Sequence, residues 1–284
     1  MKSKSIILVV VLLLALDLLV WRTIILINPS DDLTIYFLSV GQGDSELVIL
    51  PGGVKVLIDG GPNNEVLTDL AAILPQTDRY IDLVINSHPE IDHFLGLIDV
   101  LKNYRVGTFI SNGREGTADS WQALVEVLKN SKIPAVSLAA GDRIRYRENY
   151  FDILSPDKNF INNKDLNDTS LVVLLKSQNL KALFVGDIGV KPEKYLAAKF
   201  DISADILKVG HHGSKYSSIA DFLKAVSPKI AVTEVGKNTY GHPTKEVLDR
   251  LASIGAQIYR TDNNGTVKIV VAKDSSQIQV FKEK

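Results

Sequence analysis

The sequence predicts an α/β fold in which two mixed β-sheets pack face to face with helices on their outer sides, preceded by an N-terminal transmembrane helix. Three observations support this prediction. The chain begins with one long apolar stretch. Blocks of short apolar runs adjoin blocks that alternate such runs with helical patterns, and this order occurs twice. Neither βαβ alternation nor hairpins alone accounts for it. Every histidine follows a predicted strand.

The composition limits the class of protein. The 284 residues are 45% hydrophobic and 23% charged, with a formal net charge of −1 and no cysteine. These values are typical of a globular protein with a sizeable core and exclude a disordered chain. Without cysteine, disulfides and thiolate metal sites are excluded, so a transition metal must be bound by histidines and carboxylates. The near-zero net charge argues against a broad basic surface for duplex nucleic acid.

The first predicted element is a membrane anchor within residues 1–30. The apolar stretch 6–27 contains only two charged side chains, Asp17 and Arg22. As a helix rising ~1.5 Å per residue it reaches roughly 33 Å, which is enough to cross a bilayer. Asp17 near the middle costs about 2.5–3.5 kcal/mol, and the surrounding apolar residues outweigh that cost.

The charges that flank the anchor predict its orientation. Lys2 and Lys4 precede it, and Asp31 and Asp32 follow it. By the positive-inside rule the N-terminus lies in the cytoplasm. We therefore expect a single-pass protein of the cell membrane whose domain, residues 31–284, is extracytoplasmic. The alternatives are a cleaved signal peptide, which would give a secreted protein, and a buried helix. The apolar region is long for a signal peptide, and no small-x-small site follows it.

Strands and helices follow one another along the rest of the chain. Apolar runs bounded by Gly and Pro turns predict strands, and a 3.6-residue period predicts helices. The predicted strands are 34–40, 45–50, 55–58, 83–86, 106–110, 143–146, 150–154, 170–175, 182–185, 206–209, 230–233, 257–260, 266–271 and 277–281. The predicted helices are 65–74, 94–103, 118–130, 192–199, 217–226 and 245–254. No linker interrupts the part after the anchor, which predicts one domain.

The segment SHPEIDH, residues 87–93, is the densest group of candidate metal ligands. On an extended loop His88, Glu90 and Asp92 are spaced by two and point the same way. His93 then begins the next helix, with Asp92 placed to cap it. Donors aimed in two directions can serve two metal ions. The alternative is a polar turn whose aspartate only caps the helix.

Three further segments carry candidate ligands after predicted strands. Asp187 ends an apolar strand, where a carboxylate bridging two ions would lie. His211 and His212 stand between glycines, which let the backbone approach a ligand closely. His242 is followed by Pro243, which fixes the start of the next helix. Each segment taken singly also fits an ordinary turn or a satisfied loop histidine. Taken together, the four segments predict a metal site.

Six stretches match a pattern known from one family, in the family's order. They are FLSVGQGDSELVILPGGVKVLIDGG (37–61), SHPEIDHFLG (87–96), NDTSLVVLL (167–175), LFVGDIG (183–189), LKVGHHGSKYSS (207–218) and NTYGHPTKEVLDRL (238–251). On these stretches the chain resembles the metallo-β-lactamase fold superfamily, and more narrowly the extracellular hydrolase domain of the ComEC/Rec2 competence proteins and their stand-alone relatives. The resemblance implies an αββα sandwich with metals at the strand ends between the two sheets.

The resemblance and the motif chemistry together assign expected roles. The expected metal ligands are His88, Glu90, Asp92, His93, Asp168, Asp187, His211 and His242. One ion would be held by Asp92, His93, Asp187 and His242. The second would be held by His88, Glu90 and Asp187 with Asp168 or His211. The expected catalytic residues are Asp92, His211 and His212, and the expected substrate-binding residues are Asn167, Gly213 and Ser214.

The sequence departs from the family pattern at three positions. Ser39 stands where relatives have Asp in the DVGQGD motif, Glu90 stands where Asp or His is usual, and Leu95 replaces a usual Gly. The glutamate carboxylate reaches one methylene further, which alters one metal position. We expect the Ser39 change to touch the residues that support the ligands.

The expected function is that of a metal-dependent hydrolase acting on a phosphodiester, with Zn²⁺ or Mn²⁺ as cofactor and two ions per site. The competence relatives imply single-stranded DNA as the substrate. One alternative is another ester or amide hydrolase, such as a phosphocholine esterase, a lactonase or a β-lactamase-like enzyme, since one fold hosts all of these. The other is a metal-binding module with weakened catalysis. The sequence identifies no protein partner.

Overall fold

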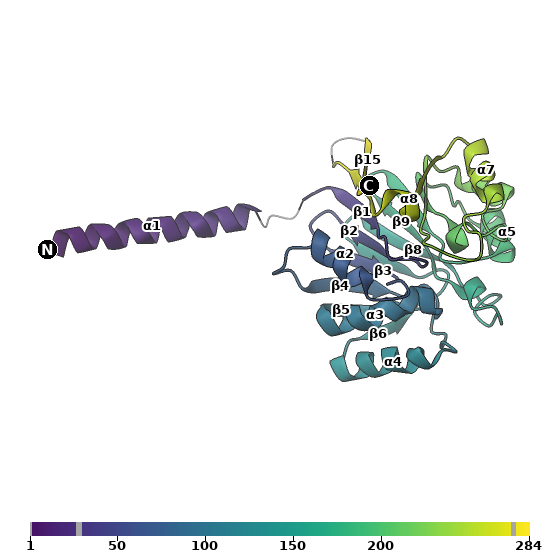
Figure 1. The fold of residues 1–284 in the computed structure, drawn as a ribbon, viewed down its shortest axis with the longest axis horizontal. Helices are drawn as coiled ribbons and strands as arrows, with labels where there is room; N and C mark the ends of the chain where they lie inside the picture. Colours follow the sequence, from purple (N-terminus) through teal and green to yellow (C-terminus); the bar gives the residue numbers. More distant parts are fainter. Residues whose placement is uncertain (1, 27–29, 274–276) are drawn as a thin grey trace.

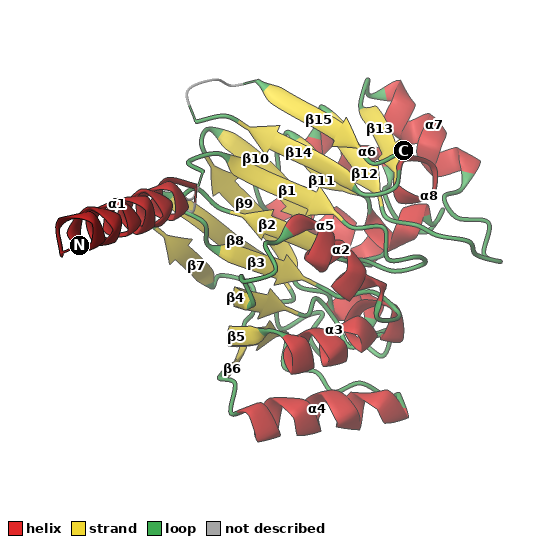
Figure 2. Ribbon diagram, turned by 60° about the vertical axis from the view of Figure 1, so that its left-hand side comes forward, coloured by secondary structure: helices red, strands yellow, loops and turns green. Residues whose placement is uncertain are grey.

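The computed structural model describes residues 2–26, 30–273 and 277–284. Helix α1 (Lys2–Leu26) extends away from two stacked β-sheets, and the remaining helices cover the outer faces of those sheets (Figures 1 and 2). The predicted αββα arrangement of two mixed sheets is therefore confirmed. The segment Ser3–Arg22 of α1 is long and apolar enough to cross a membrane, and none of it is buried. The predicted apolar stretch ends at residue 27 and the predicted anchor at residue 30, and residues 27–29 lie outside the described part of the chain.

The first sheet has eight strands and is mixed in direction. In spatial order they are β15 (Ile278–Lys282), β14 (Val267–Val271), β1 (Leu33–Phe37), β2 (Glu46–Ile49), β3 (Lys55–Ile58), β4 (Tyr80–Ile85), β5 (Arg105–Ser111) and β6 (Ala135–Ser137). Strands β15 to β3 pair antiparallel, and β3 to β6 pair parallel.

The second sheet has seven strands and repeats this plan. In spatial order they are β13 (Gln257–Arg260), β12 (Ile230–Thr233), β11 (Ile206–Lys208), β10 (Leu180–Phe184), β9 (Val172–Ser177), β8 (Asn149–Ser155) and β7 (Arg143–Tyr146). Strands β10 to β13 are parallel, and β7 to β10 are antiparallel.

Helices cover the outer face of each sheet. The first sheet carries α2 (Glu65–Ile73), α3 (Ile91–Asn103) and α4 (Asp119–Ser131). The second carries α5 (Val190–Lys199), α6 (Ala220–Val226) and α7 (Lys245–Ser253). Short helical turns complete the chain at η1 (Asn167–Thr169), η2 (Gly210–Gly213) and α8 (Thr261–Asn264).

Three apolar layers hold the sandwich together. The layer between the sheets includes Phe37 of β1 and Phe184 of β10, whose ring centroids lie 6.2 Å apart. A second layer packs Phe94 and other residues of α2–α4 on the first sheet, and a third packs Leu196 and Phe222 on the second. Burial of apolar side chains on both faces explains the near-continuous hydrophobic runs of the central strands.

Several element boundaries differ from the prediction. Strand β1 ends at Phe37 because residues 38–40 leave the ladder for the glycine turn that follows. Helix α3 begins at Ile91 rather than at residue 94, and α6 begins at Ala220 rather than at 217. Strand β6 was not predicted, because its three residues are exposed and carry no apolar pattern.

Candidate metal centre

The parallel strands of both sheets end at one edge, and the loops after them bring four potential metal ligands together. Asp92 and His93 follow β4, Asp187 follows β10, and His212 follows β11. One ligand atom from each lies within 4.8 Å of the others. We call these four residues the metal cluster. The structure thus brings these four residues, which are distant in sequence, together at one edge.

Asp187 lies at the middle of the metal cluster. Its Oδ2 is 3.4 Å from His93 Nε2 and 3.3 Å from His212 Nε2. Asp92 contacts the same two nitrogens, with Oδ2 at 3.3 Å from His212 Nε2 and Oδ1 at 3.8 Å from His93 Nε2. Both imidazoles therefore present Nε2 to the two carboxylates.

Neighbouring groups hold the two imidazoles in this orientation. His93 Nδ1 donates to Asp59 Oδ2 at 2.8 Å, and His212 Nδ1 donates to the carbonyl oxygen of Glu234 at 2.9 Å. Because Nδ1 has its own acceptor in each ring, Nε2 is the nitrogen at which a metal ion would replace a proton. Metal-ligating histidines in proteins are usually oriented in this way.

The chemistry of the metal cluster fits a divalent cation. His93 Nε2 is fully buried and has no hydrogen-bond partner among the described residues. Burial favours neutral His212, but Asp187 and Asp92 outweigh this effect and raise the pKa of His212 to about 9. Burial likewise opposes ionisation of Asp187, yet His212 and His93 hold its pKa well below the usual range. The carboxylates thus create a field that attracts positive charge. Mixed imidazole and carboxylate donors suit Zn²⁺, Mn²⁺ or iron.

His88 lies directly beside the metal cluster, but its nitrogens have other partners. Its ring centroid is 4.1 Å from that of His93. Nδ1 lies 2.9 Å from Ser87 Oγ, and Nε2 lies 3.1 Å from Asn167 Oδ1. Burial and the neighbouring His93 lower the pKa of His88 to about 3, so this ring is neutral. Asn167, which we predicted to bind substrate, therefore contacts His88, which we predicted to bind metal.

His211 and His242 form the outer side of the site. His211 Nε2 is 3.9 Å from Asp187 Oδ2, and the ring centroids of His211 and His242 are 5.8 Å apart. His242 Nδ1 is buried without a hydrogen-bond partner among the described residues. We expected His242 to complete the first ligand set, whereas the structure places His212 there. Sequence spacing alone could not decide which loop histidine reaches inward.

Besides His88, His211 and His242, two further expected ligands, Glu90 and Asp168, lie outside the metal cluster. Glu90 is the residue before α3, and no group of ligand atoms among the described residues includes it. Asp168 accepts hydrogen bonds at both oxygens, 3.0 Å from Gly189 N and 3.0 Å from Asn163 Nδ2. The expected geometry of the first segment was also wrong. Since α3 begins at Ile91, Asp92 lies in the first helical turn and does not cap the helix.

The backbone around His212 is tightly constrained. His211 and His212 have positive φ values of 50° and 51°, which non-glycine residues rarely adopt. A Cβ on Gly213 would lie 2.5 Å from Cβ of Pro243, so only glycine fits between these two loops. Ser214, the other expected substrate-binding residue, donates its backbone N–H to the His211 carbonyl at 2.8 Å. These contacts fix the loop that presents the histidine pair.

The sequence analysis missed a second group of buried acids behind the metal cluster. We call Asp44, Glu46 and Glu234 the inner cluster. Lys208 Nζ bonds to Asp44 and lies 3.5 Å from Asp187 Oδ1, so one ammonium group links the two clusters. Asp44 and Glu234 also follow strand or turn motifs, and the strand-end argument that selected Asp187 could have selected them.

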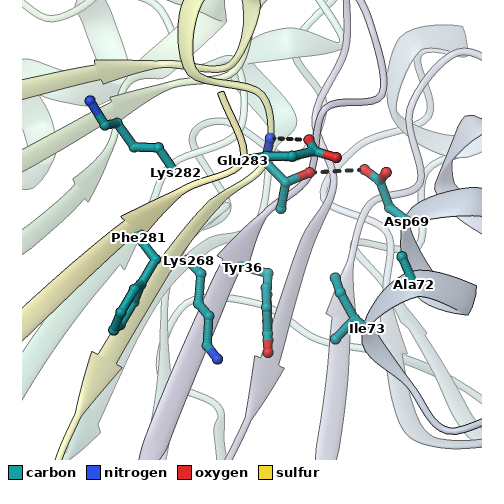
Figure 3. A pocket seen from close by; sticks show the side chains of 9 residues that line it. Tyr36, Asp69, Ala72, Ile73, Lys268, Phe281, Lys282 and Glu283 are labelled. Carbon is teal, nitrogen blue, oxygen red and sulfur yellow. Dashed lines mark hydrogen bonds between the residues drawn. The ribbon is translucent and has the colours of Figure 1, made fainter.

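The family departure at Ser39 lies away from the metal cluster. The Ser39 backbone N–H donates to Asp69 Oδ2 at 2.9 Å and to Thr266 Oγ1 at 3.2 Å. Asp69 and Thr266 line a surface pocket of about 240 Å³ beside Tyr36 and Phe281 (Figure 3). Among the described residues, these hydrogen bonds of Ser39 do not reach the metal cluster, so they do not support the expectation that Ser39 affects the metal ligands.

Comparison with solved structures agrees with this architecture. The metallo-beta-lactamase fold protein YhfI from Bacillus subtilis superposes with a TM-score of 0.56 at 12% identity, covering 84% of this chain and 99% of that one. A diphosphatase of the PhnP family superposes with a TM-score of 0.51 at 16% identity, covering 84% and 98%. At these identities the likeness concerns the fold.

Curated relatives are similar in sequence over most of the chain. ComE operon protein 3 of Bacillus subtilis is 27% identical over 250 residues, which cover 81% of this chain and 32% of the relative. Recombination protein 2 of Haemophilus influenzae is 28% identical over 253 residues, covering 87% and 30%. Competence protein ComA of Neisseria gonorrhoeae is 27% identical over 255 residues, covering 88% and 34%. The chain spans about a third of the length of these relatives.

The family model described as "Metallo-beta-lactamase superfamily" matches residues 38–234, which is more than half of the chain and includes the whole metal cluster. Together with the two mixed sheets and the strand-end ligands, this match shows that the chain belongs to the metallo-β-lactamase superfamily.

Proposed function

We propose that this protein is a membrane-anchored phosphodiesterase that hydrolyses single-stranded DNA outside the cytoplasm, with two divalent ions, Zn²⁺ or Mn²⁺, at the metal cluster. The observation that carries the proposal is the meeting of Asp92, His93, Asp187 and His212 within 4.8 Å at the edge of the two sheets. Such a ligand set binds a divalent ion, and the fold belongs to a family of metal-dependent hydrolases.

The metal cluster would hold one ion, and His88 would help to hold the second. Asp187 lies between His93 and His212, within 3.9 Å of His211 as well, and so is placed to bridge two ions. Glu90 and Asp168 would complete the second position by turning their carboxylates inward. When bound, two such ions lower the pKa of a bound water to about 7 and stabilise the attacking and leaving oxygens.

Residues beyond the ligands would position the phosphodiester. His211 is half-buried and reaches both the metal cluster and solvent. From there it can protonate the leaving oxygen through Nε2. The Ser214 hydroxyl and the backbone of Gly213 lie in the same loop and can contact a phosphate oxygen. Asn167 keeps the His88 ring in place through its 3.1 Å contact.

The choice of a DNA substrate is supported by the relatives. One relative is named as a recombination protein and another as a competence protein, and a structural neighbour is named as a diphosphatase. Hydrolysis of a phosphodiester bond in DNA is consistent with both observations. The apolar segment Ser3–Arg22 supports membrane attachment.

The activity is tested on the full-length protein in detergent, loaded with Mn²⁺ or Zn²⁺. The substrates are a single-stranded oligodeoxynucleotide and bis-p-nitrophenyl phosphate. We expect turnover of both by the wild-type protein and background rates for Asp187→Asn. Asp201→Asn removes an exposed aspartate elsewhere and should keep full activity. Bound metal without turnover of either substrate would refute the proposal and favour a metal-binding module.

The orientation is tested with single cysteines, because the natural chain has none. Ser253→Cys places a thiol on the exposed end of α7, and Ser3→Cys places one at the N-terminal end of the apolar segment. In intact cells a membrane-impermeant maleimide should label Ser253→Cys only. Labelling of Ser3→Cys alone would reverse the proposed orientation.

A further inference from the structure

We propose that Tyr216 and Tyr240 are stacking platforms for nucleobases, placed on the two loops that border the metal cluster, so that the site selects a single-stranded, base-bearing strand. This inference rests on the proposed function and deepens it. It assigns substrate contacts to two side chains that neither bind metal nor belong to the core.

The first support is the unusual exposure of the two rings. Beyond α1, the described part of the chain has six exposed large apolar side chains: Tyr80, Ile91, Val136, Tyr216, Tyr240 and Phe281. Tyr240 is 73% exposed and Tyr216 is 66% exposed, whereas none of the other four exceeds 49%. The two most exposed rings thus lie four residues from His212 and two residues from His242. Ile91, next to Asp92, adds a third apolar side chain to the same border.

The second support is a continuous path of rings from Tyr240 to the metal cluster. The Tyr240 ring centroid is 5.7 Å from that of His242, at an interplanar angle of 31°. His242 is in turn 5.8 Å from His211, whose Nε2 is 3.9 Å from Asp187 Oδ2. A base stacked on Tyr240 therefore brings its sugar and phosphate toward the ligands.

The third support is that both loops are held in place by hydrogen bonds. The Asn238 side chain accepts from the backbone N–H of Tyr240 and His242 at 3.1 Å each, and donates to the carbonyls of Gly236 and His242 at 2.9 Å each. Four bonds from one side chain fix the loop that carries Tyr240. A preformed aromatic surface loses little conformational entropy when a base stacks on it.

The loop of Tyr216 is braced in a similar way. Buried Ser217 donates its hydroxyl to the Gly210 carbonyl at 2.8 Å and lies 3.0 Å from the Ser214 carbonyl. The Tyr216 backbone N–H donates to Ser214 Oγ at 3.4 Å. The ring is therefore exposed on a fixed loop.

Charge favours a nucleic acid strand over an uncharged apolar ligand. Lys215 and Lys237 are both exposed and lie in the same two loops as the tyrosines. Lys215 Nζ is 5.1 Å from the Tyr216 ring centroid. Lysines that can contact phosphates, beside aromatic rings on which bases can stack, are the features of surfaces that bind single strands without sequence preference.

The test compares two oligomers of equal length on the full-length protein in detergent with Mn²⁺. One is a single-stranded oligodeoxynucleotide, and the other carries abasic tetrahydrofuran sites and so has the same phosphates without bases. Removing one base–aromatic stack should lower kcat/KM on the base-bearing strand roughly five- to 100-fold for Tyr216→Ala or Tyr240→Ala. The change should fall in KM, because stacking stabilises the bound ground state and the transition state alike.

Three comparisons make the result specific to stacking. Cleavage of the abasic oligomer should be unchanged by either alanine variant. Tyr216→Phe and Tyr240→Phe should retain the wild-type KM, since the ring remains. Tyr80→Ala removes an exposed tyrosine at the opposite end of β4 and should change neither substrate.

Equal losses on both oligomers, or no loss on the base-bearing strand, would overturn the inference. Binding of both oligomers with EDTA present, measured by fluorescence anisotropy, separates this outcome from failure of the proposed function. If the wild-type protein cleaves neither oligomer, the proposed activity falls. Tighter binding of the base-bearing strand by the wild-type protein, lost in both alanine variants, would still support stacking. Equal binding of the two oligomers by the wild-type protein would refute it.

Discussion

The metal cluster and the inner cluster lie next to each other, share buried carboxylates, and balance their charge in different ways. In the metal cluster two imidazoles present Nε2 to two carboxylates, and the Asp92 side chain is 37% exposed, so ions and water can reach it. In the inner cluster all three acids are buried, and Lys208 already supplies a cation through Asp44. Ser45 N–H donates to Glu234 Oε1 at 3.0 Å.

This difference indicates that a group of buried acids can bind a metal ion only when protons or a neighbouring lysine do not already balance its negative charge. Burial raises the pKa of Glu46 well above its usual value, and burial raises that of Glu234 to about 7, with each acid also facing the other. Protons on the two glutamates and the bond from Lys208 Nζ to Asp44 therefore balance the charge of the inner cluster, and burial lowers the pKa of Lys208 to about 7. In the metal cluster the positive charge is carried by imidazoles, whose Nε2 protons a divalent ion can replace.

The largest expected effect follows from removing the cation of the inner cluster. Lys208→Met leaves Asp44 buried without its partner, which should lower the free energy of unfolding by about 3–5 kcal/mol. Thermal and urea unfolding of the full-length protein measure this change. Lys229→Met removes an exposed lysine paired with Asp205 and should change stability by less than about 0.5 kcal/mol. Similar stability of the two variants would show that the ammonium group is not needed.

A buried acid held only by backbone groups provides the next comparison. Glu193 of α5 accepts from the backbone N–H groups of Ser218 and Ile219, and Arg250 acts on it only at longer range. Burial raises its pKa to about 7, above the usual 4.5. Its contribution to stability is therefore fully present below pH 4.5 and is lost as the pH rises through 7.

The variant Glu193→Gln isolates this titration. Relative to the variant, the wild-type protein should lose about 3 kcal/mol of stability between pH 4.5 and 7, since one pKa unit corresponds to about 1.36 kcal/mol. Urea unfolding at a series of pH values measures the difference between the two proteins. A pH-independent difference would show that the backbone donors keep Glu193 ionised throughout.

A smaller loss of stability is expected from a substitution in the loop that carries His212. Gly213→Ala places a Cβ against Pro243 at a position with φ of +80° and should destabilise the protein by about 2 kcal/mol. Gly255→Ala has a similar φ of +78° with nothing within 4 Å of the added carbon. The difference in stability between the variants measures the clash alone. We also expect only Gly213→Ala to weaken metal affinity, because it moves His212.

The smallest effect is expected at the inner cluster itself. Glu46→Gln puts a neutral side chain of the same shape in place of an acid whose pKa burial raises well above its usual value. We expect a change of less than about 1 kcal/mol in stability and unchanged affinity for Zn²⁺. Chemical unfolding and metal titration check the two expectations. A loss of metal affinity in this variant would indicate that the inner cluster binds the metal, which would contradict the difference drawn between the two clusters.

The sequence predicted the two-sheet architecture and most of the residues around the metal centre. This succeeded because apolar runs mark buried strands, and polar side chains directly after parallel strands meet at one edge. It could not rank His212 above His242, because the choice depends on left-handed backbone at residues 211 and 212 that spacing does not reveal. It missed the bond between Asp44 and Lys208 because the two residues are 164 positions apart, and no sequence pattern pairs them.

The central claim is that Asp92, His93, Asp187 and His212 together bind a divalent ion. Zn²⁺ titration by calorimetry of the full-length protein in detergent tests it most directly, with Asp187→Asn and His212→Ala beside the wild type. The account predicts tight binding by the wild type and loss of that binding in both variants, with the fold retained by circular dichroism. Wild-type affinity in both variants would contradict it.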